Sequence, residues 1–306
     1  MSAGEWLDSF PGVRRHEPLA RHSQFGVGGP AEWFITTRET TVLAELLRRC
    51  SDSGVPVTVL GAGSNTLISD DGIDGLVVRH DDRTLRVADE HTVELGAGCM
   101  MPRVALDCAS RGLAGVEFGI GVPGTLGASV YGNAGAFGTE MSDVLIDCTS
   151  LDARGEPLTL TAAECDFGYR RSRFKDDLRD NAIVSARLRV HADDPDQVRA
   201  RTDAIQAERK ATQPYGIRSL GSVFKNPLDD KAGRLIEAAE LKGRRSGGAQ
   251  ISPKHANFIV NVDHATAADV LALVHIAHDT VQERFGVNLE REIIVLGKQH
   301  SDDHRG

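Results

Sequence analysis

The 306-residue chain is long for a single hydrophobic core, because cores stop growing near about 250 to 300 residues, so two or three subdomains are expected. Apolar residues make up 41% of the chain and charged residues 26%, which excludes a disordered or collagen-like protein. The net charge of -9 argues against nucleic acid as the main partner, because phosphate backbones are bound through basic surfaces.

The first predicted elements are a helix and a short strand. Between residues 40 and 54 the apolar residues recur at i, i+3, i+4 and i+7, which predicts a helix that ends at Gly54. The β-branched segment 57–60 predicts a strand, and it runs directly into the glycine-rich stretch 61–65. The order helix, strand and glycine turn is therefore expected here.

Strands dominate the remainder of the first 190 residues. Alternating apolar residues and turn residues predict, in chain order, a strand at 75–79, a hairpin between 85 and 95, a helix at 102–110, and strands at 145–151, 158–160 and 183–190. Between Gly112 and Gly138 glycine is so dense that no ordinary helix is expected. This part of the chain is therefore predicted to be α+β with much strand.

The pattern changes to helices near residue 200, where a domain boundary is predicted. The expected elements are a helix at 196–210, a loop around Ser222, a helix at 232–241 and a helix at 267–285. Thr266 and Asp269 form a capping-box pattern before the last helix.

Two glycine-rich stretches, 61–65 and 119–138, have the composition of phosphate-binding loops. Glycine lets backbone amides approach an anion closely, because there is no Cβ to hold the anion away. Either stretch alone is equally well explained as a tight turn in a β-rich fold. Neither is a GxGxxG fingerprint that opens a helix, so a Rossmann fold is not indicated. Two such loops in one chain favour a diphosphate held from two sides.

Three motifs in this order resemble the UDP-N-acetylenolpyruvoylglucosamine reductase family: LGAGSNTL at 60–67, GVPGTLGA at 121–128 and NAGA at 133–136. The resemblance extends from GGPA at 28–31 to LERE at 289–292. It implies an FAD-binding domain of the vanillyl-alcohol oxidase type, built of two α+β subdomains, and a C-terminal α+β substrate-binding domain. The FAD contacts that it implies are Gly61, Ala62, Gly63, Ser64, Asn65, Thr66, Gly121, Pro123, Gly124, Thr125, Gly127, Ala128, Asn133, Gly135 and Ala136.

The resemblance also implies an activity and a division of the chain. NADPH would reduce FAD, and enolpyruvyl-UDP-N-acetylglucosamine would then be reduced to UDP-N-acetylmuramate, a peptidoglycan precursor. The expected parts are FAD-binding subdomains at 1–80 and 81–199, a substrate-binding domain at 200–297 and a flexible tail at 298–306. The expected partners are the substrate and NADPH, without nucleic acid or membrane, and the expected state is a monomer.

Three residues match the catalytic positions of the family. Arg170, in FGYR at 167–170, would face the substrate carboxylate through its planar donor fork, although a solvated basic cluster with its neighbours is the alternative. Ser222, in GSVFKNP at 221–227, would protonate C2 of the substrate, although a turn or cap serine is the alternative. The third residue is Glu292. Substrate contacts are expected from Tyr169, Lys225, Asn226 and Gln250.

Glu292 can also be weighed on its own chemistry. Alternation over 289–296 places Glu290 and Glu292 on the face of a predicted strand that also carries apolar residues. A carboxylate on such a face needs a partner or a function, unless the strand is leaving solvent at that point. The resemblance favours Glu292 as the active-site acid, and the choice between Glu290 and Glu292 beside the flavin stays open.

Two further comparisons with the family concern loops. The short separation of Arg170 and Ser222 is similar to the shorter type of the family, which lacks an inserted substrate-covering tyrosine loop. Gly26 departs from the larger, often basic residue that many relatives of the shorter type carry. This departure bears on FAD contacts from the turn at 24–29 and leaves the catalytic residues unaffected.

Other signals are interpreted as structural. His275 and His278 form an HxxH pair without further ligands, so no metal site is predicted. The five cysteines, Cys50, Cys99, Cys108, Cys148 and Cys165, make no CxxC pair and are interpreted as core residues with reduced thiols. With neither a signal sequence within 1–19 nor about 20 consecutive apolar residues, a cytoplasmic protein is expected. The rival interpretations are another flavin oxidoreductase of the same fold and a non-catalytic flavin or UDP-sugar binding protein.

Overall fold

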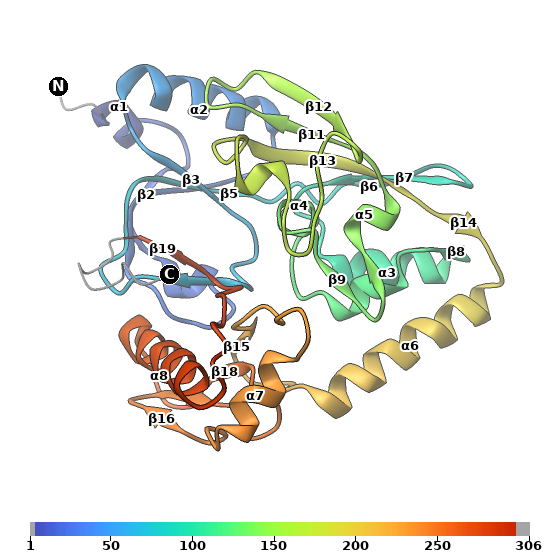
Figure 1. Cartoon of the computed structure of the whole chain (residues 1–306). Coiled ribbons are helices and arrows are strands. Elements are labelled where there is room, and N and C mark those ends of the chain that lie inside the picture. Colours follow the sequence, from blue (N-terminus) through green and yellow to red (C-terminus); the bar gives the residue numbers. More distant parts are fainter. Residues whose placement is uncertain (1–3, 298–306) are drawn as a thin grey trace. The chain divides into compact units, whose positions relative to one another are not determined.

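The computed structural model describes residues 4–297, and these residues form two compact units, each with a hydrophobic core of its own. The first unit comprises residues up to 15, 33–62 and 75–209, and the second comprises 16–32, 63–74 and the chain from 210 onward (Figure 1). The chain thus passes between the units several times. The predicted tail at 298–306 lies outside the described residues.

A four-stranded sheet with the order β1-β2-β5-β3 forms one layer that involves the first unit. Its strands are β1 (Arg14–Pro18), β2 (Pro30–Thr37), β5 (Ile73–His80) and β3 (Val57–Leu60). Helix α2 (Thr40–Ser53) buries Leu43, Leu46, Leu47 and Cys50 in the same core as Leu76 and Val78 of β5. Gly54 ends α2 in the left-handed conformation that glycine adopts without strain. The predicted helix and both strands are confirmed.

A five-stranded antiparallel sheet, β12-β11-β13-β7-β6, forms the second layer of the first unit. Its strands are β12 (Pro157–Thr161), β11 (Leu145–Leu151), β13 (Ala182–Arg189), β7 (Thr92–Gly96) and β6 (Leu85–Asp89). Helices α3 (Met101–Ser110) and α4 (Leu126–Tyr131) contribute to its core. The predicted hairpin, strands and helix at 102–110 are confirmed to within two residues.

The glycine-dense region contains a helix that the sequence prediction denied. α4 begins after Thr125, whose side-chain oxygen accepts a hydrogen bond from the Ala128 amide. A Cβ at Gly127 would lie 3.1 Å from that of Ala97, so glycine lets α4 pack closely on its neighbour. Glycine is therefore tolerated for packing, at the expense of helix propensity. The other short elements of the unit are α1 (Glu5–Asp8), β8 (Leu113–Ala114), β9 (Gly135–Ala136), β10 (Thr139–Glu140), α5 (Met141–Val144) and β14 (His191–Ala192).

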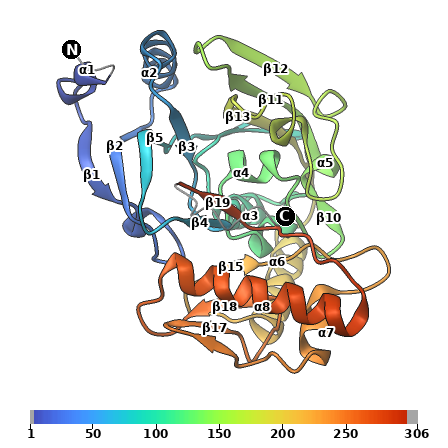
Figure 2. The same ribbon diagram turned by 60° about the vertical axis from the view of Figure 1, so that its left-hand side comes forward.

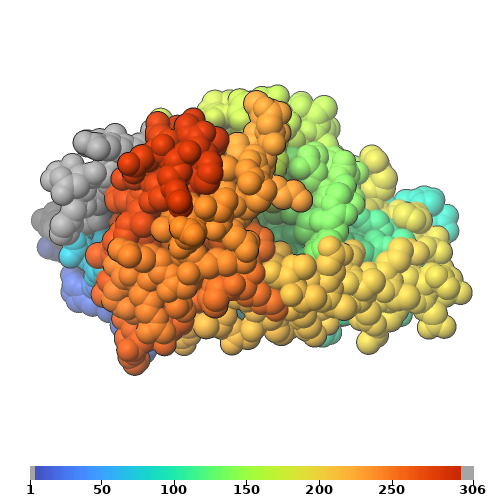
Figure 3. Space-filling view, turned by 60° about the horizontal axis from the view of Figure 1, so that its bottom comes forward, coloured from blue at the N-terminus to red at the C-terminus, as the bar shows by residue number. Residues whose placement is uncertain are grey.

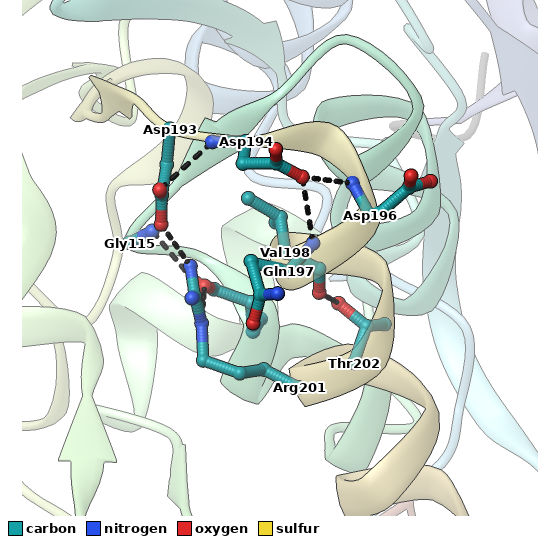
Figure 4. A network of polar contacts seen from close by, with 9 residues as sticks. Gly115, Asp193, Asp194, Asp196, Gln197, Val198, Arg201 and Thr202 are labelled. Carbon is teal, nitrogen blue, oxygen red and sulfur yellow. Dashed lines mark hydrogen bonds and ion pairs between the residues drawn. The ribbon is translucent and has the colours of Figure 1, made fainter.

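Helix α6 (Pro195–Thr212) begins in a network of polar contacts (Figure 4). Asp194 accepts the amides of Asp196 and Gln197 at 2.9 and 3.2 Å, which satisfies two groups of the first turn. Arg201 donates to Asp193 at 2.6 Å and holds the pKa of that carboxyl below its ordinary value. Of this helix only Val198 and Thr202 are buried, and its surface is yellow in Figure 3. The predicted helix at 196–210 is confirmed.

The second unit is built on a four-stranded antiparallel sheet, β15-β18-β17-β16, with helix α8 along it (Figures 1 and 2). The elements are β15 (Ser219–Ser222), β18 (Phe258–Asn261), β17 (Ala249–Ile251), β16 (Arg245–Ser246), α7 (Ala232–Ala238) and α8 (Ala267–Phe285). A parallel pair, β4 (Thr66–Ile68) and β19 (Ile294–Leu296), joins segments far apart in the chain. The capping box of Thr266 and Asp269 is present, as predicted.

Three predicted elements of the second unit need correction. Ser222 ends strand β15 and does not lie in a loop. α7 stops at Ala238 instead of 241, because Glu240 turns to a left-handed φ of 62°. The strand predicted over 289–296 is regular only at Ile294–Leu296. Each error arises where pairing with a distant segment, or one unusual dihedral, decides the local structure.

Candidate functional site

The start of the first glycine-rich stretch, at Gly61, lies beside the second stretch in the first unit. A Cβ added to Gly61 would lie 2.8 Å from Oγ1 of Thr125 and 3.8 Å from Cβ of Ala128. Contact at 2.8 Å is closer than two such atoms pack. The backbone at Gly61 therefore meets the start of α4 with room for hydrogen alone.

The second stretch folds back on itself through a short hairpin. A Cβ at Gly121 would lie 3.0 Å from both Ala136 Cβ and the ring of Phe137. Ala136 belongs to β9, which pairs with β10. The segments at 61, 121–128 and 133–136 thus form one continuous set of tightly packed loops within the first unit.

The remaining residues of the first glycine motif belong to the second unit. Gly63 has a φ of 60°, and a Cβ there would lie 2.7 Å from the carbonyl oxygen of His22. Asn65 donates from Nδ2 to the carbonyl oxygen of Glu292 at 2.9 Å, and its own carbonyl accepts the Ile294 amide at 3.0 Å. The glycine motif therefore fixes the backbone around a predicted catalytic residue that is 227 positions away.

Arg170 lies in a tight turn of the first unit. Gly168 and Arg171 exchange two backbone hydrogen bonds of 3.1 Å around Tyr169 and Arg170. The φ of Arg170 is 56°, a left-handed value that is rare for an arginine. Its guanidinium donates to the carbonyl oxygens of Asn133 and Gly135 at 3.4 and 3.3 Å. The structure thus brings Arg170 to the loop from which flavin contacts were predicted.

The basic neighbours of Arg170 behave differently. Arg171 pairs with Asp176, and Arg173 pairs with Asp177, in exposed contacts typical of a solvated surface. The alternative interpretation of a solvated basic cluster therefore describes these two arginines, whereas Arg170 turns toward the glycine loop.

Ser222 and Glu292 lie on adjacent, paired segments of the second unit. The Glu292 amide donates to the Val223 carbonyl at 2.8 Å, and the Lys225 amide donates to the Glu290 carbonyl at 2.9 Å. In this antiparallel pairing Phe224 lies opposite Arg291, which places Glu292 opposite Val223, the residue after Ser222. Two of the three predicted catalytic residues are therefore brought together in one unit, and Arg170 belongs to the other.

The two glutamates differ in surroundings. The carboxylate of Glu290 forms an ion pair with Nζ of Lys225, and 70% of its side chain is exposed. Glu292 is half-buried. A carboxylate engaged at the surface is a poor candidate for chemistry, so the structure favours Glu292. Lys225, predicted as a substrate contact, is the partner of Glu290.

The other predicted substrate contacts have structural partners too. The side-chain oxygen of Asn226 accepts the amide of Ala232 at 3.1 Å, at the start of α7. Gln250, in β17, donates to the Gly243 carbonyl at 3.0 Å. Tyr169 is 51% exposed and lies beside the Arg170 guanidinium, 5.3 Å from its ring centroid. These contacts hold the side chains in place.

Within residues 4–297 no group of three or more His, Cys, Asp or Glu side chains is arranged to hold a metal ion. His278 contacts Asp279 and Asn288, as a surface residue does. All five cysteines are buried, which confirms their prediction as core residues. No helix in this described range is both long enough and apolar enough to span a bilayer.

Comparisons with known proteins cover nearly the whole chain. Residues 31–161 match the family described as FAD binding domain, and residues 213–296 match the C-terminal domain of UDP-N-acetylenolpyruvoylglucosamine reductase. UDP-N-acetylenolpyruvoylglucosamine reductase 2 of Symbiobacterium thermophilum is 44% identical over 93% of this chain and 92% of its own length. The chain belongs to the UDP-N-acetylenolpyruvoylglucosamine reductase family.

Other members of the UDP-N-acetylenolpyruvoylglucosamine reductase family agree. The reductase of Lactococcus lactis subsp. cremoris is 37% identical, with 96% of this chain and 98% of the relative covered. The crystal structure of the Thermus caldophilus reductase superposes with a TM-score of 0.79 at 34% identity, over 92% of this chain and 98% of that one. The predicted family, fold class and FAD cofactor are confirmed.

Gly26 lies against the side chain of Arg218. Gly26 has a φ of 78°, and a Cβ there would lie 2.0 Å from Nη1 of Arg218. The Arg218 guanidinium therefore occupies the space of a side chain at position 26. Arg218 and Glu140 were not singled out in the sequence, and Lys175 was interpreted only as a member of the solvated basic cluster around Arg170, although Glu140 and Lys175 both contact the surroundings of Arg170. No local pattern marks them.

Substituting Gly61 with alanine is expected to weaken FAD binding about 5- to 150-fold. The added methyl would displace the Thr125 hydroxyl, and overpacking of this kind costs about 1–3 kcal/mol. Gly132→Ala is the matched control, since a Cβ there would lie at an ordinary 3.5 Å from its nearest neighbour. Titration of the apoprotein with FAD, followed by flavin fluorescence, measures both. Unchanged affinity in Gly61→Ala would show that the loop does not contact the cofactor.

Proposed function

We propose that the protein reduces enolpyruvyl-UDP-N-acetylglucosamine to UDP-N-acetylmuramate with NADPH, in peptidoglycan precursor synthesis. The observation that carries this proposal is the pairing of the segment after Ser222 with the segment that holds Glu292, because it places a candidate proton donor and a candidate acid on neighbouring segments of a reductase-family chain.

The loops of the first unit fit FAD. Gly61 and Gly121 pack so closely on their neighbours that a Cβ would fill the space, and a loop without a Cβ lets the backbone approach a diphosphate closely. Residues of 61–66, 121–128 and 133–136 would hold the cofactor. When bound, FAD accepts hydride from NADPH and supplies it to C3 of the enolpyruvyl group.

Arg170 would bind the substrate carboxylate and stabilise negative charge as it develops there. The guanidinium is a permanent cation with a planar set of donors, which matches a carboxylate in shape and charge. Its backbone is held in a turn, so the group is oriented before the substrate arrives. Donors oriented in advance stabilise a transition state with little reorganisation.

Ser222 and Glu292 would act in the protonation of the substrate at C2. Ser222 would donate a proton to C2 of the substrate, and Glu292, protonated or sharing a proton, would stabilise the enolate-like charge beside it. Asn65 binds the Glu292 carbonyl and thereby fixes the backbone from which this carboxyl extends. Tyr169, Lys225, Asn226 and Gln250 would contact the substrate around these groups.

The proposal extends to the organisation of the protein. We propose FAD-binding subdomains at 1–80 and 81–199 and a substrate-binding domain at 200–297, in the shorter type of the family that lacks the tyrosine loop. The net charge of -9 supports a protein that acts on small molecules and does not bind nucleic acid. We further propose a cytoplasmic monomer that does not bind membrane.

An anaerobic experiment tests the function. The FAD-loaded protein is reduced with NADPH, the enolpyruvyl nucleotide is added, and the visible absorption of oxidised flavin is followed. Reoxidation with formation of UDP-N-acetylmuramate is expected. Reduction by NADPH without reoxidation would instead indicate another flavin oxidoreductase of this fold, and protein that binds FAD but is not reduced would indicate a binding protein.

A further inference from the structure

We propose that Lys175 and Glu140 are positioning residues that hold the turn of Arg170 against the loop at 133–136. This inference rests on the proposed role of Arg170. Both residues contact the turn or its direct partner, and neither belongs to the sets of predicted catalytic, substrate or FAD contacts.

The turn needs support because its backbone is strained. Tyr169 and Arg170 occupy the two central positions, and the positive φ of Arg170 is the value that glycine or asparagine normally takes at the second of them. Strain of this kind persists only where the surroundings enforce it. If the turn relaxed, the side chain of Arg170 would move with it.

Lys175 supports one end of the turn. Its Nζ donates a hydrogen bond of 2.8 Å to the carbonyl oxygen of Arg170, and the same ammonium lies 5.5 Å from the ring centroid of Tyr131. Hydrogen bonds from a charged donor are about twice as strong as neutral ones. Lys175 is also the sole lysine within residues 1–209, where the other long basic side chains are arginines. A compact ammonium suits a single carbonyl better than a planar fork.

Glu140 supports the other end through Asn133. The fully buried amide of Asn133 donates to Oε1 of Glu140 at 2.9 Å and to the carbonyl oxygen of Gly168 at 3.1 Å, and it accepts the Ser142 amide at 2.9 Å. Reversing the amide would break all three contacts. Glu140 thus orients the group that binds Gly168, the first residue of the turn.

The two supports act on the same guanidinium. They hold the carbonyls of Gly168 and Arg170, while the Arg170 guanidinium reaches the carbonyls of Asn133 and Gly135 in the loop that Glu140 also contacts. Displacing a catalytic group by about 1 Å can cost ~10²-fold in rate. Loss of one support should displace Arg170 partially, so we expect substrate-dependent flavin reoxidation to slow about tenfold.

The main test is Lys175→Met in the FAD-loaded enzyme, with both half-reactions followed anaerobically. NADPH should reduce the flavin at the wild-type rate, whereas reoxidation by the enolpyruvyl substrate should slow about tenfold. Arg171→Met is the matched control, since it removes the same charge from the same segment but leaves the bond to the Arg170 carbonyl. It should keep both rates, and Lys175→Arg should restore part of the loss.

Combination with Arg170→Ala distinguishes positioning from general destabilisation. If Lys175 acts through Arg170, the double variant should reoxidise no more slowly than Arg170→Ala alone. Two outcomes would overturn the positioning role and leave the proposed role of Arg170 intact. In the first, Lys175→Met slows reoxidation a further tenfold when it is added to Arg170→Ala. In the second, Lys175→Met alone reoxidises at the wild-type rate although Arg170→Ala is impaired. Full turnover by Arg170→Ala would overturn the proposed role of Arg170 and this inference with it.

Glu140 provides an independent variant if Lys175→Met folds poorly. Glu140→Ala removes the acceptor that orients Asn133, and it should slow reoxidation about tenfold while flavin reduction is unchanged. Glu140→Gln keeps one acceptor oxygen and should recover most of the rate. Equal rates for wild type and Glu140→Ala would contradict the support from this side.

Discussion

Arg170→Ala is expected to lower kcat for reduction of the enolpyruvyl substrate by ~10² to 10³, the usual cost of removing one oriented charge-stabilising group. Reduction of the flavin by NADPH should continue, because Arg170 is proposed to act on the substrate carboxylate alone. Rapid-reaction measurement of the two half-reactions checks both expectations. Turnover close to that of the wild type would exclude Arg170 from catalysis.

Arg170→Gly separates the guanidinium from the backbone on which it sits. Both substitutions remove the charge, so both should lose the same activity. Glycine accepts the φ of 56° without strain whereas alanine does not, so Arg170→Gly should be more stable than Arg170→Ala by about 1 kcal/mol. Thermal unfolding of the two FAD-loaded variants measures the difference. Equal loss of activity in both variants, together with higher stability of Arg170→Gly than of Arg170→Ala, is the result expected if the backbone of Arg170 is strained at a functional site.

Glu292→Gln is expected to lower kcat by ~10² to 10³, because an amide keeps the shape of the acid but has no acidic proton and no negative charge. The surrounding backbone contacts with Val223 and Asn65 use the main chain of Glu292, so they should survive the substitution. Steady-state turnover and the rate of flavin reoxidation both report the loss.

Glu290→Gln is the matched control for Glu292→Gln. It makes the same chemical change two residues away, in a side chain that is exposed and paired with Lys225 at the surface. Exposed ion pairs contribute little, so turnover should stay within about fivefold of wild type. Equal losses in the two variants would mean that the segment, and not the carboxyl of Glu292, is what matters. A larger loss in Glu290→Gln would reverse the assignment.

Local sequence predicted the elements whose stability is local. The helix at 267–285 was predicted to the residue, because its apolar stripe, the capping box of Thr266 and Asp269, and the terminal Gly286 all lie within one segment. The strand at 145–151 was predicted equally well from its alternation. The short helix α4 was missed, since it lies in a glycine-dense region, and its own glycine, Gly127, is explained by close packing on Ala97 of a different segment.

The candidate site shows the same division. The residues that resemble the reductase family could be named from motifs, because a motif is a property of neighbouring positions. The ion pair of Lys225 with Glu290 joins residues 65 positions apart, and the bond from Asn65 to Glu292 spans 227. No pattern in the chain predicts either contact. The first contact engages the Glu290 carboxylate at the surface, and the second holds the backbone of Glu292.

In the sequence by itself, the resemblance of the motifs at 60–67, 121–128 and 133–136 indicated the family, and with it the FAD chemistry and the candidate catalytic residues. Helix caps and apolar periods, which act over a few residues, predicted the local elements. Only the tertiary structure decided that Gly61 packs on Thr125, that Arg170 is held in a left-handed turn, and that Lys175 and Glu140 support it. These features depend on distances across folded segments, where hydrogen bonds and packing override the preferences of the single residue.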